Sequence, residues 1–380
     1  MGSTSVEPQA WGPDVDEKNI QVEDAQGTMI VKFSNATTAE ERIQCSKLAS
    51  TAFGKSLSPE GYLEREEYLG QLPLTRDSGW RFWRLTRTDD PKQVLAMCKT
   101  IHRDLLVRDV HGTSKKQGYC IASVVTDPRY RGRGLAAILL KNVAEWMDGP
   151  GNAVASMLYS DVGQFYVSKG WSMLDASQST LRVPPSLPRE LVGFPKTQSL
   201  TKEDIPELCE RDVKYLKEEF YDYDLPPDSF LMAVLPTTNV VGWQQSRAEF
   251  MGDKTVAKVP EIKGSLCKSV STWLYWYHDF GRDRLNIQRI RTARVKNDLG
   301  TQALAVLLLD ALHEAVNWKL SKVVVWSPSP ELHLAMKLLT DKMGIGISNE
   351  ERENELPCLR RKGRESGPVT LWPNEFYGWS

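Results

Sequence analysis

The sequence predicts a protein of the α/β (α+β) class in which two halves share a similar order of elements. Apolar strand patterns alternate with apolar residues at helical spacing along most of the 380 residues. The order strand–strand–helix–strand–helix occurs in the first half and again in the second, without a residue-level repeat. A segment at 183–195 that contains four prolines separates the halves and is the best linker candidate.

The first half begins with a polar, acidic segment, and residues 1–27 are expected to form a flexible tail. The ordered part of the chain is expected to begin at the strand pattern 29–33. Two helices follow with clear start signals: a hydroxyl cap and first-turn acids after Thr37, and a proline at the first helical position after Ser58. These helices are expected at 37–53 and 58–69, followed by strands at 80–85, 94–102, 119–126 and 153–159, a polar loop at 109–118, helices at 135–147 and 162–169, and an extended segment at 171–174.

The second half resumes after the linker. Its expected elements are helices at 204–220, 298–318 and 330–343 and strands at 271–278, 285–291 and 323–326. The aromatic run 273–280 alternates like a strand between layers, so most of it is expected in the core. The acidic run 350–355 is expected to be a solvated loop, or else a surface that attracts a basic peptide. The expected segments are a tail (1–27), a first domain (28–183), a linker (184–197) and a second domain (198–380).

The composition bounds the class of protein. Hydrophobic residues make up 41% and charged residues 26%, which excludes fibrous and wholly disordered proteins. The 48 Lys+Arg and 49 Asp+Glu leave a net charge of −1, so neither nucleic acid nor a membrane surface is expected as a partner. The six cysteines form no CxxC pair and the five histidines are scattered, so no metal site is expected. No secretory signal or bilayer-length apolar stretch is evident, and the expected compartment is the cytosol.

The most informative stretch is 124–137, where a buried strand is followed by a turn rich in Gly and Arg and then by a helix. Amides at a helix start have no internal acceptor and lie at the positive end of the helix dipole, so they bind anions. Gly132 and Gly134 allow the backbone to approach an oxygen-rich ligand, and Arg131 and Arg133 add charge that suits phosphate. The turn is therefore predicted to hold a pyrophosphate.

Several ligands compete for this turn. A Walker loop would require Lys followed by Ser or Thr, which is missing. A dinucleotide fingerprint would have to be Gly132-x-Gly134-x-x-Ala137, which is a weak match so far into the chain. A further alternative is that the glycine turn binds no ligand. Acetyl-coenzyme A is the remaining option, and it is the one favoured by a resemblance to a known superfamily.

The segment Arg131-Gly132-Arg133-Gly134-Leu135-Ala136 fits the pattern Arg/Gln-x-x-Gly-x-Gly/Ala and resembles the GNAT superfamily of N-acetyltransferases. The segment 165–171 (FYVSKGW) resembles the Phe-Tyr-x-x-x-Gly-Phe segment of the same superfamily, at the expected distance. Together these matches cover roughly residues 28–183. The resemblance implies a mixed central sheet flanked by helices, with acetyl-CoA as co-substrate and no metal.

The resemblance also implies roles for individual residues. The end of the central strand is expected to separate from its neighbour and to offer amides to the thioester and the pantetheine arm. Tyr166 is the expected acid that protonates the departing thiolate, since a phenol stays protonated at neutral pH. The implied acetyl-CoA-binding residues are Val124, Val125, Thr126, Arg131, Gly132, Arg133, Gly134, Leu135 and Ala136.

The base that removes the amine proton stays open. A lysine-like amine has a pKa near 10.4, so deprotonation at pH 7 costs about 4–5 kcal/mol. The strand 119–126 contains no acid, and a lone histidine such as His102 is more often structural. His278-Asp279 of the second half is a further candidate that could face the site, but deprotonation through water is favoured. Asp161 precedes the next short helix and is favoured as its N-cap over a role as the base, and it is also named as a candidate substrate-binding residue. Tyr159 stands where many members of the superfamily have Asn, so its contact with the pantetheine arm must differ.

The whole chain is similar to the fungal L-lysine N6-acetyltransferase family, on 158–163 (LYSDVG), the aromatic run 273–280 and overall length. This resemblance implies acetyl transfer from acetyl-CoA to the N6 amine of L-lysine, as a step of lysine catabolism. The second half, with one glycine at 294–300, is expected to be a degenerate GNAT-like module without a coenzyme site that covers the acceptor pocket. The apolar tail 371–379 is expected to reach that pocket, with Glu375 as an amine ligand.

Two further functions stay open. One is acetylation of protein or peptide lysine, or of another amine such as a polyamine. The other, from a different class, is a non-catalytic acyl-CoA-binding scaffold, against which an intact Tyr166 and glycine turn argue. The oligomeric state is not predicted.

Overall fold

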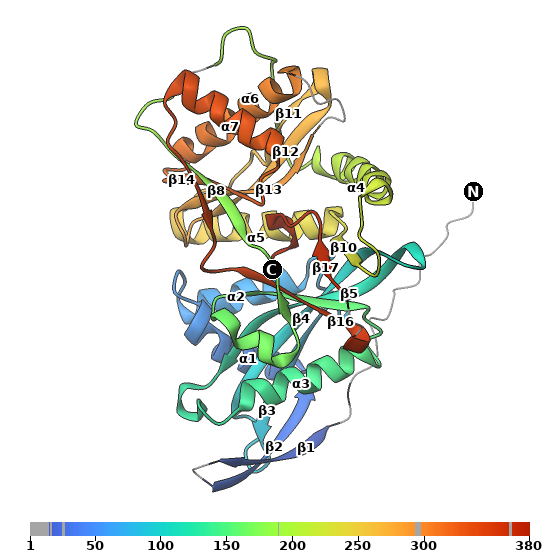
Figure 1. The fold of residues 1–380 in the computed structure, drawn as a ribbon. Helices are drawn as coiled ribbons and strands as arrows, with labels where there is room; N and C mark the ends of the chain where they lie inside the picture. Colours follow the sequence, from blue (N-terminus) through green and yellow to red (C-terminus); the bar gives the residue numbers. More distant parts are fainter. Residues whose placement is uncertain (1–14, 16, 25–26, 189, 293–297, 365–366) are drawn as a thin grey trace, which may run out of the picture.

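The computed structural model describes residues 15, 17–24, 27–188, 190–292, 298–364 and 367–380, and Figure 1 shows its course. Two sheets organise these residues, one of ten strands and one of seven, in the lower and upper parts of Figure 1. Helices pack against both sheets. The predicted α/β class is confirmed.

The ten-stranded sheet is built mostly from the first half of the chain. Its main order is β1-β2-β3-β4-β5-β6-β16-β7, and β10 pairs with both β4 and β17. The β5–β6 and β10–β17 pairs are parallel and the others antiparallel, so the sheet is mixed as expected. Its strands are β1 (Lys18–Asp24), β2 (Gly27–Asn35), β3 (Trp80–Arg87), β4 (Val94–Asp109), β5 (Gly112–Thr126), β6 (Ala155–Ser160), β7 (Ser172–Met173), β10 (Phe230–Val234), β16 (Leu356–Arg361) and β17 (Val369–Leu371).

Two expectations about this sheet are wrong. The predicted flexible tail contains β1, which pairs with β2 from Lys18↔Phe33 to Asp24↔Gly27; residues 1–14 of that tail lie outside the described residues. The predicted loop 109–118 is a continuation of strand, because β4 and β5 form one long hairpin that closes at Asp109↔Gly112. Both strands are rich in polar residues, so the sequence shows little apolar alternation that would predict them. An exposed hairpin does not require such alternation.

Helices cover both faces of this sheet. Helix α1 (Ala39–Phe53) and α2 (Pro59–Gly70) pack on the face that carries Phe82, Met97 and Val125. Helix α3 (Leu135–Asp148) and the short 3₁₀ helix η2 (Gly163–Lys169) pack on the opposite face with Trp83 and Cys98. The alternation Phe82/Trp83 and Met97/Cys98 assigns the two faces, because successive strand residues point to opposite sides.

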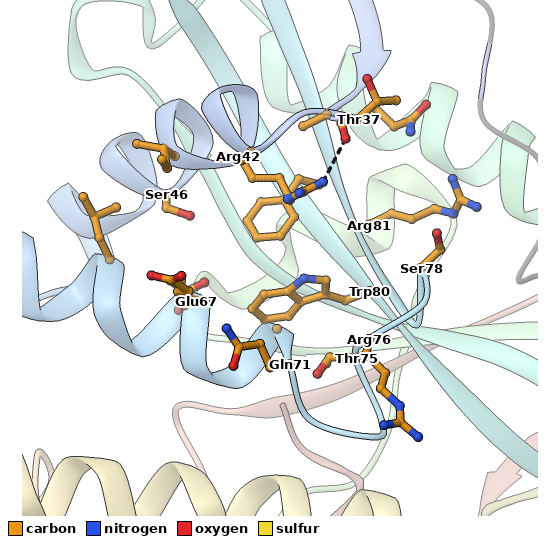
Figure 2. A pocket seen from close by; sticks show the side chains of 18 of the residues that line it. Thr37, Arg42, Ser46, Glu67, Gln71, Thr75, Arg76, Ser78, Trp80 and Arg81 are labelled. Atoms are coloured by element: carbon orange, nitrogen blue, oxygen red, sulfur yellow. Dashed lines mark hydrogen bonds between the residues drawn. The ribbon is translucent and has the colours of Figure 1, made fainter.

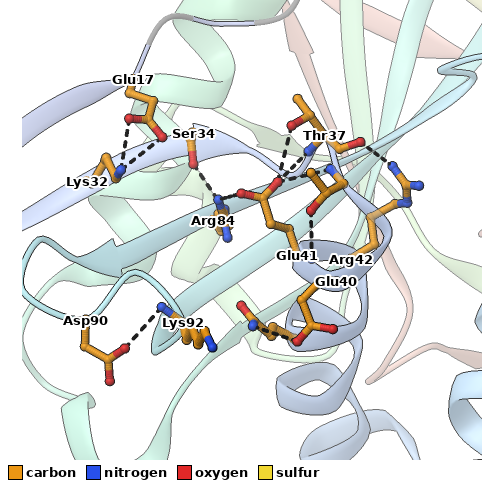
Figure 3. Close-up of polar contacts among 12 residues, drawn as sticks. Glu17, Lys32, Ser34, Thr37, Glu40, Glu41, Arg42, Arg84, Asp90 and Lys92 are labelled. Atoms are coloured by element: carbon orange, nitrogen blue, oxygen red, sulfur yellow. Dashed lines mark hydrogen bonds and ion pairs between the residues drawn. The ribbon is translucent and has the colours of Figure 1, made fainter.

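Helix α1 begins at a capping box that also joins the helix to the sheet (Figure 3). The Thr38 hydroxyl accepts from the Glu41 amide at 3.2 Å, and the Glu41 carboxylate accepts from the Thr38 amide at 3.1 Å. The same carboxylate pairs with Arg84 on β3, whose Nε donates to Ser34 at 3.1 Å. The sequence predicts a hydroxyl cap within Thr37-Thr38, and Thr38 is the observed cap.

Thr38→Ala is expected to lower the free energy of unfolding by about 1 kcal/mol, because the Glu41 amide loses its acceptor. Urea unfolding followed by circular dichroism measures the change. Ser50→Ala in the same helix is the control, since the Ser50 hydroxyl only donates to the Lys47 carbonyl on the exposed side. Equal stability of the two variants would show that the cap contributes nothing.

The seven-stranded sheet belongs mainly to the second half, in the order β15-β8-β14-β13-β12-β11-β9. Helices α6 and α7 form a core with one face of it, and α5 contacts the strand β12 and the helix α2 of the other half. The elements are β8 (Ser177–Arg182), β9 (Gln198–Leu200), β11 (Gly264–Cys267), β12 (Thr272–Asp279), β13 (Arg284–Arg291), β14 (Lys322–Trp326), β15 (Ile347–Glu351), α4 (Ile205–Asp222), α5 (Thr238–Val256), α6 (Asp298–Asn317) and α7 (Pro330–Met343).

Strand exchange interlocks the two halves. The strand β8, which precedes the proline-rich segment, pairs with β14 and β15 of the second sheet. In the other direction, β16 from the last part of the chain lies between β6 and β7 of the first sheet. Sheet membership therefore crosses the predicted boundary at residue 183. Helix α6 has the length and apolar composition of a membrane span, but it is largely buried in the second core.

Candidate active site

The central strand β5 separates from β6 near its end. The two strands pair from Gly118↔Ala155 to Ile121↔Leu158, and β5 then continues to Thr126. In the described part of the chain, no strand pairs with the β6 side of β5 beyond Ile121. On its other side the register with β4 shifts at this level, and Ser123 has a φ of 54°. This bulge interrupts the β4–β5 ladder. The unpaired β6 side of β5 beyond Ile121 matches the separation that the GNAT resemblance implies.

The glycine turn follows directly and ends at the start of α3. Gly132 and Gly134 have φ values of 80° and 74°, and a Cβ on either would meet no atom within 4 Å among the described residues. Gly134 occupies the cap position of α3 without a side-chain cap hydrogen bond. The first amides of α3 therefore lie beside an exposed, side-chain-free surface, which suits an anionic ligand.

The predicted acetyl-CoA-binding residues lie in one continuous bend. Val125 and Leu135 are buried and contribute backbone only, while Val124, Thr126, Arg133 and Ala136 are half-buried. Arg131 is exposed, and its Nε lies 3.4 Å from the Thr126 carbonyl. A backbone cradle flanked by arginines fits a pyrophosphate, so the arrangement is suited to acetyl-CoA. The assignment of each residue to the coenzyme stays a prediction.

Tyr166 lies on η2, in the core shared by α3 and the sheet, with 7% of its surface exposed. Its ring meets Phe165 edge-on at 5.1 Å between centroids. Burial raises the pKa of the phenol above its usual value of 10, so the hydroxyl is protonated at neutral pH. That state is the one an acid needs in order to protonate a thiolate. The catalytic role of Tyr166 stays a prediction.

The two predicted substrate-binding residues, Asp161 and Glu375, are engaged within the protein. Asp161 accepts the Glu355 amide at 2.8 Å and lies 3.4 Å from the Arg282 guanidinium; it does not cap η2, whose cap position is Val162. Glu375 accepts from Arg289 at 2.7 Å and from the Ile290 amide at 2.9 Å. Because both oxygens of Glu375 are occupied by protein donors, its contacts give no support to the expected role as an amine ligand.

Glu375 lies beside a gap in the second sheet. The strands β13 and β14 pair in parallel at Leu285↔Val323 and Asn286↔Val324 and then separate, as β5 and β6 do. The Ile290 amide beyond that point is held by Glu375. The tail of the chain thus caps one free amide beside this gap, next to the hollow that Glu375 helps to line. This contact gives a structural reason for expecting only one coenzyme site.

Neither histidine named from the sequence is placed as a base. His102 is buried, and burial lowers its pKa to about 3. His278 is buried beside Glu314, with 2.8 Å between its Nε2 and the carboxylate. Burial again lowers its pKa despite that partner. Deprotonation through water therefore stays the expectation. Among the described residues, no group of three or more His, Cys, Asp or Glu could hold a metal.

Among the hollows of the described structure, one of about 950 Å³ lies between α1, α2 and β3 with Trp80 in its wall (Figure 2). None of the residues predicted for the site lines it. A second hollow of about 850 Å³ lies between α4, β13 and the tail and includes Glu375. A third of about 60 Å³ lies where the α1–α2 loop meets Arg247 and Tyr277 of the second half.

Comparison with known proteins agrees with this geometry. Residues 34–174 match the family described as an acetyltransferase (GNAT) domain, and residues 180–380 match the LYC1 GNAT-like C-terminal domain. A lysine acetyltransferase of Yarrowia lipolytica (strain CLIB 122 / E 150) is 24% identical over 364 residues, covering 84% of this chain and 90% of that protein.

Solved structures show the same fold. A conserved protein of Enterococcus faecalis V583 superposes with a TM-score of 0.53 at 15% identity, covering 87% of this chain and 72% of that one. A GCN5-related N-acetyltransferase of Anabaena variabilis gives 0.51 at 14% identity, with the same coverage. A GCN5-related N-acetyltransferase of Kribbella flavida gives 0.50 at 15% identity, covering 87% and 71%.

The separated strands, the open glycine turn and the GNAT match over 34–174 define an N-acetyltransferase enzyme of the GNAT superfamily. The chain belongs to the family with the LYC1 GNAT-like C-terminal domain, whose model covers more than half of it. The resemblance to GNAT acetyltransferases that the sequence indicates is confirmed.

Proposed function

We propose that this enzyme transfers the acetyl group of acetyl-CoA to the N6 amine of free L-lysine, by direct attack in a complex that holds both substrates. The observation that supports acetyl-CoA as the acetyl donor is the continuous backbone surface from the bulge at Ser123 to the glycine turn. Lysine as the acetyl acceptor is supported by the relative from Yarrowia lipolytica, which is named a lysine acetyltransferase and aligns along most of this chain.

The chemistry follows from the residues around the gap. The neutral lysine nitrogen attacks the thioester carbonyl carbon, the new C–N bond forms and the C–S bond breaks. Backbone amides near the bulge stabilise charge on the carbonyl oxygen. The proton lost by the nitrogen leaves through water, and the phenol of Tyr166 gives a proton to the thiolate. The products are N6-acetyllysine and free coenzyme A.

The closed acceptor side favours a small molecule over a protein. The face of β6 that carries Tyr159 packs against Trp326 of the second sheet and the tail residues Phe376 and Trp379. The strand β16 seals the neighbouring edge. Because the second sheet and the tail cover this face of β6, a folded protein surface has less access to the strand gap from this side than a free amino acid has. The six cysteines are all free and buried, which supports the proposed cytosolic location.

An amine panel tests the proposal. Thiol release from acetyl-CoA is measured with L-lysine, with spermidine and with a lysine-containing peptide. We expect turnover with L-lysine at a kcat/KM at least about 100-fold above that of the peptide, since the second sheet and the tail cover the face of β6 that a peptide backbone would have to cross. Turnover restricted to the peptide or to spermidine would contradict the lysine assignment. A thermal shift with NAD in place of acetyl-CoA controls for non-specific binding to the glycine turn.

A further inference from the structure

A buried arginine between the two sheets, Arg352, has two guanidinium nitrogens without a hydrogen-bond partner among the described residues. Arg352 follows β15 and has only 6% of its surface exposed. Its Nε donates to the Ala176 carbonyl at 3.1 Å. Its Nη1 and Nη2 are buried and have no hydrogen-bond partner among the residues that the structure describes. The guanidinium carbon lies 3.6 Å from the ring centroid of Trp326, so the group is held flat against the indole.

Other buried polar groups without a hydrogen-bond partner among the described residues lie on β6, β13 and β14. The Tyr159 hydroxyl, the Trp326 indole nitrogen and both amide atoms of Asn286 are buried without a hydrogen bond to any described residue. The Tyr159 and Trp326 rings are 5.6 Å apart. Asn286 pairs with Val324, two residues before Trp326 on the same strand face, and with Tyr277 on its other side. We call these four residues (Tyr159, Asn286, Trp326 and Arg352) the interdomain polar cluster.

Such a cluster is costly unless something binds to it. A buried donor or acceptor without a partner costs about 1–3 kcal/mol, and charged groups cost more. Native proteins therefore pair nearly all of their buried polar atoms. Several orphaned groups on one patch indicate a ligand that supplies the missing partners. A guanidinium with two free terminal nitrogens matches a carboxylate, which accepts both bonds at once.

The cluster lies on the acceptor side of the strand gap. Tyr159 is the first residue of β6 after its last pair with β5, Ile121↔Leu158. Leu158 belongs to the core under α3 and Tyr166, so Tyr159 points to the opposite face of the sheet. A ligand anchored at Arg352 would therefore approach the gap from the face opposite Tyr166. Burial lowers the pKa of Arg352 to about 10, which leaves the group charged at neutral pH.

We infer that Arg352 binds the α-carboxylate of the amino-acid acceptor, with Asn286 and Tyr159 completing the polar contacts. This inference rests on the proposed acetylation of a free amino acid and names the group that reads its carboxylate. The enzyme thereby selects amines that carry a carboxylate at a distance from the reacting nitrogen, and it discriminates against simple diamines.

Two analogues of lysine test the inference on one enzyme preparation. Cadaverine lacks the carboxylate of lysine, whereas 6-aminohexanoate keeps it and lacks the α-amine. The wild type is expected to prefer both lysine and 6-aminohexanoate over cadaverine, in kcat/KM. Arg352→Gln is expected to lower kcat/KM for lysine and 6-aminohexanoate by about 100-fold and to leave that for cadaverine within a few fold. Each ratio is independent of the fraction of active enzyme, so partial misfolding does not affect it.

Arg361→Gln is the matched control, because Arg361 also lies over an aromatic ring, 4.3 Å from the Phe230 centroid, and pairs with Asp109. It should keep the wild-type lysine-to-cadaverine ratio. Arg352→Lys, which keeps the charge but loses the paired donors, should fall between Arg352→Gln and the wild type. An equal loss for all three amines in Arg352→Gln would overturn the inference alone. A wild type that acetylates neither lysine nor 6-aminohexanoate would contradict the proposed function first.

Discussion

Tyr166→Phe is expected to lower kcat by about 100-fold or more while leaving the KM for acetyl-CoA nearly unchanged. General acid catalysis contributes about 100-fold to 10,000-fold, and the substitution removes only the hydroxyl that gives the proton. The ring stays, so its packing with Phe165 and the core under α3 is preserved. Steady-state kinetics over a range of acetyl-CoA concentrations separate the two constants.

Tyr119→Phe is the matched control for this experiment. Tyr119 is buried in the same core, and its hydroxyl donates to the Gly151 carbonyl at 3.1 Å, away from the strand gap. This variant should lose a little stability and keep its kcat. Equal kcat values for Tyr166→Phe and the wild type would remove the acid role. Because burial raises the pKa of Tyr166, the wild-type kcat should show no loss from its deprotonation up to about pH 10.

The parts of the donor site that the sequence predicts are local ones. The glycine turn depends on φ values that only glycine adopts readily, so its residue types are visible in the chain. The strand before it and the helix after it carry apolar periodicity, and Tyr166 follows in the same unit. Each of these features is decided within about 45 consecutive residues. The turn and its flanking elements could therefore be placed without any tertiary information.

The acceptor side was missed because it is assembled from distant segments. Arg352 and Glu355 lie in an acidic run that was expected to be a solvated loop, yet both are buried. Glu355 pairs with Arg284, and Arg352 covers Trp326; both partners are far away in the sequence. Charge composition predicts exposure, and only the insertion of β16 into the first sheet brings this run inside. No spacing rule in one sequence reports such a strand exchange.

The predicted role of Glu375 shows the same limit. The sequence correctly indicated that the apolar tail docks, since Phe376 and Tyr377 are buried. It could not indicate which cation the acid meets. Arg289 is held between Asp212 at 2.8 Å and Glu375 at 2.7 Å, so the acid contacts a protein cation in this structure. Apolar residues in the sequence indicate which segment will be buried. The residue that pairs with a buried charge, in contrast, depends on the tertiary fold.

Gly134→Val is expected to raise the KM for acetyl-CoA by about 100-fold, equivalent to about 2.7 kcal/mol of binding free energy. The residue has a φ of 74° at the cap of α3, and the space above it is open among the described residues. A branched side chain fills that space, and it also favours a backbone that turns the first amides of α3 away from the ligand. Isothermal titration with coenzyme A measures the affinity directly.

Gly344→Val separates backbone strain from ligand contact. Gly344 ends α7 with a φ of 67°, and a Cβ there would likewise meet no described atom within 4 Å. Both variants therefore force a branched residue into the left-handed region at a helix end, with a similar cost to stability. Only Gly134→Val should lose coenzyme A affinity. Equal affinities in the two variants would mean that the glycine turn does not hold the coenzyme, and the donor half of the proposed mechanism would then require another site.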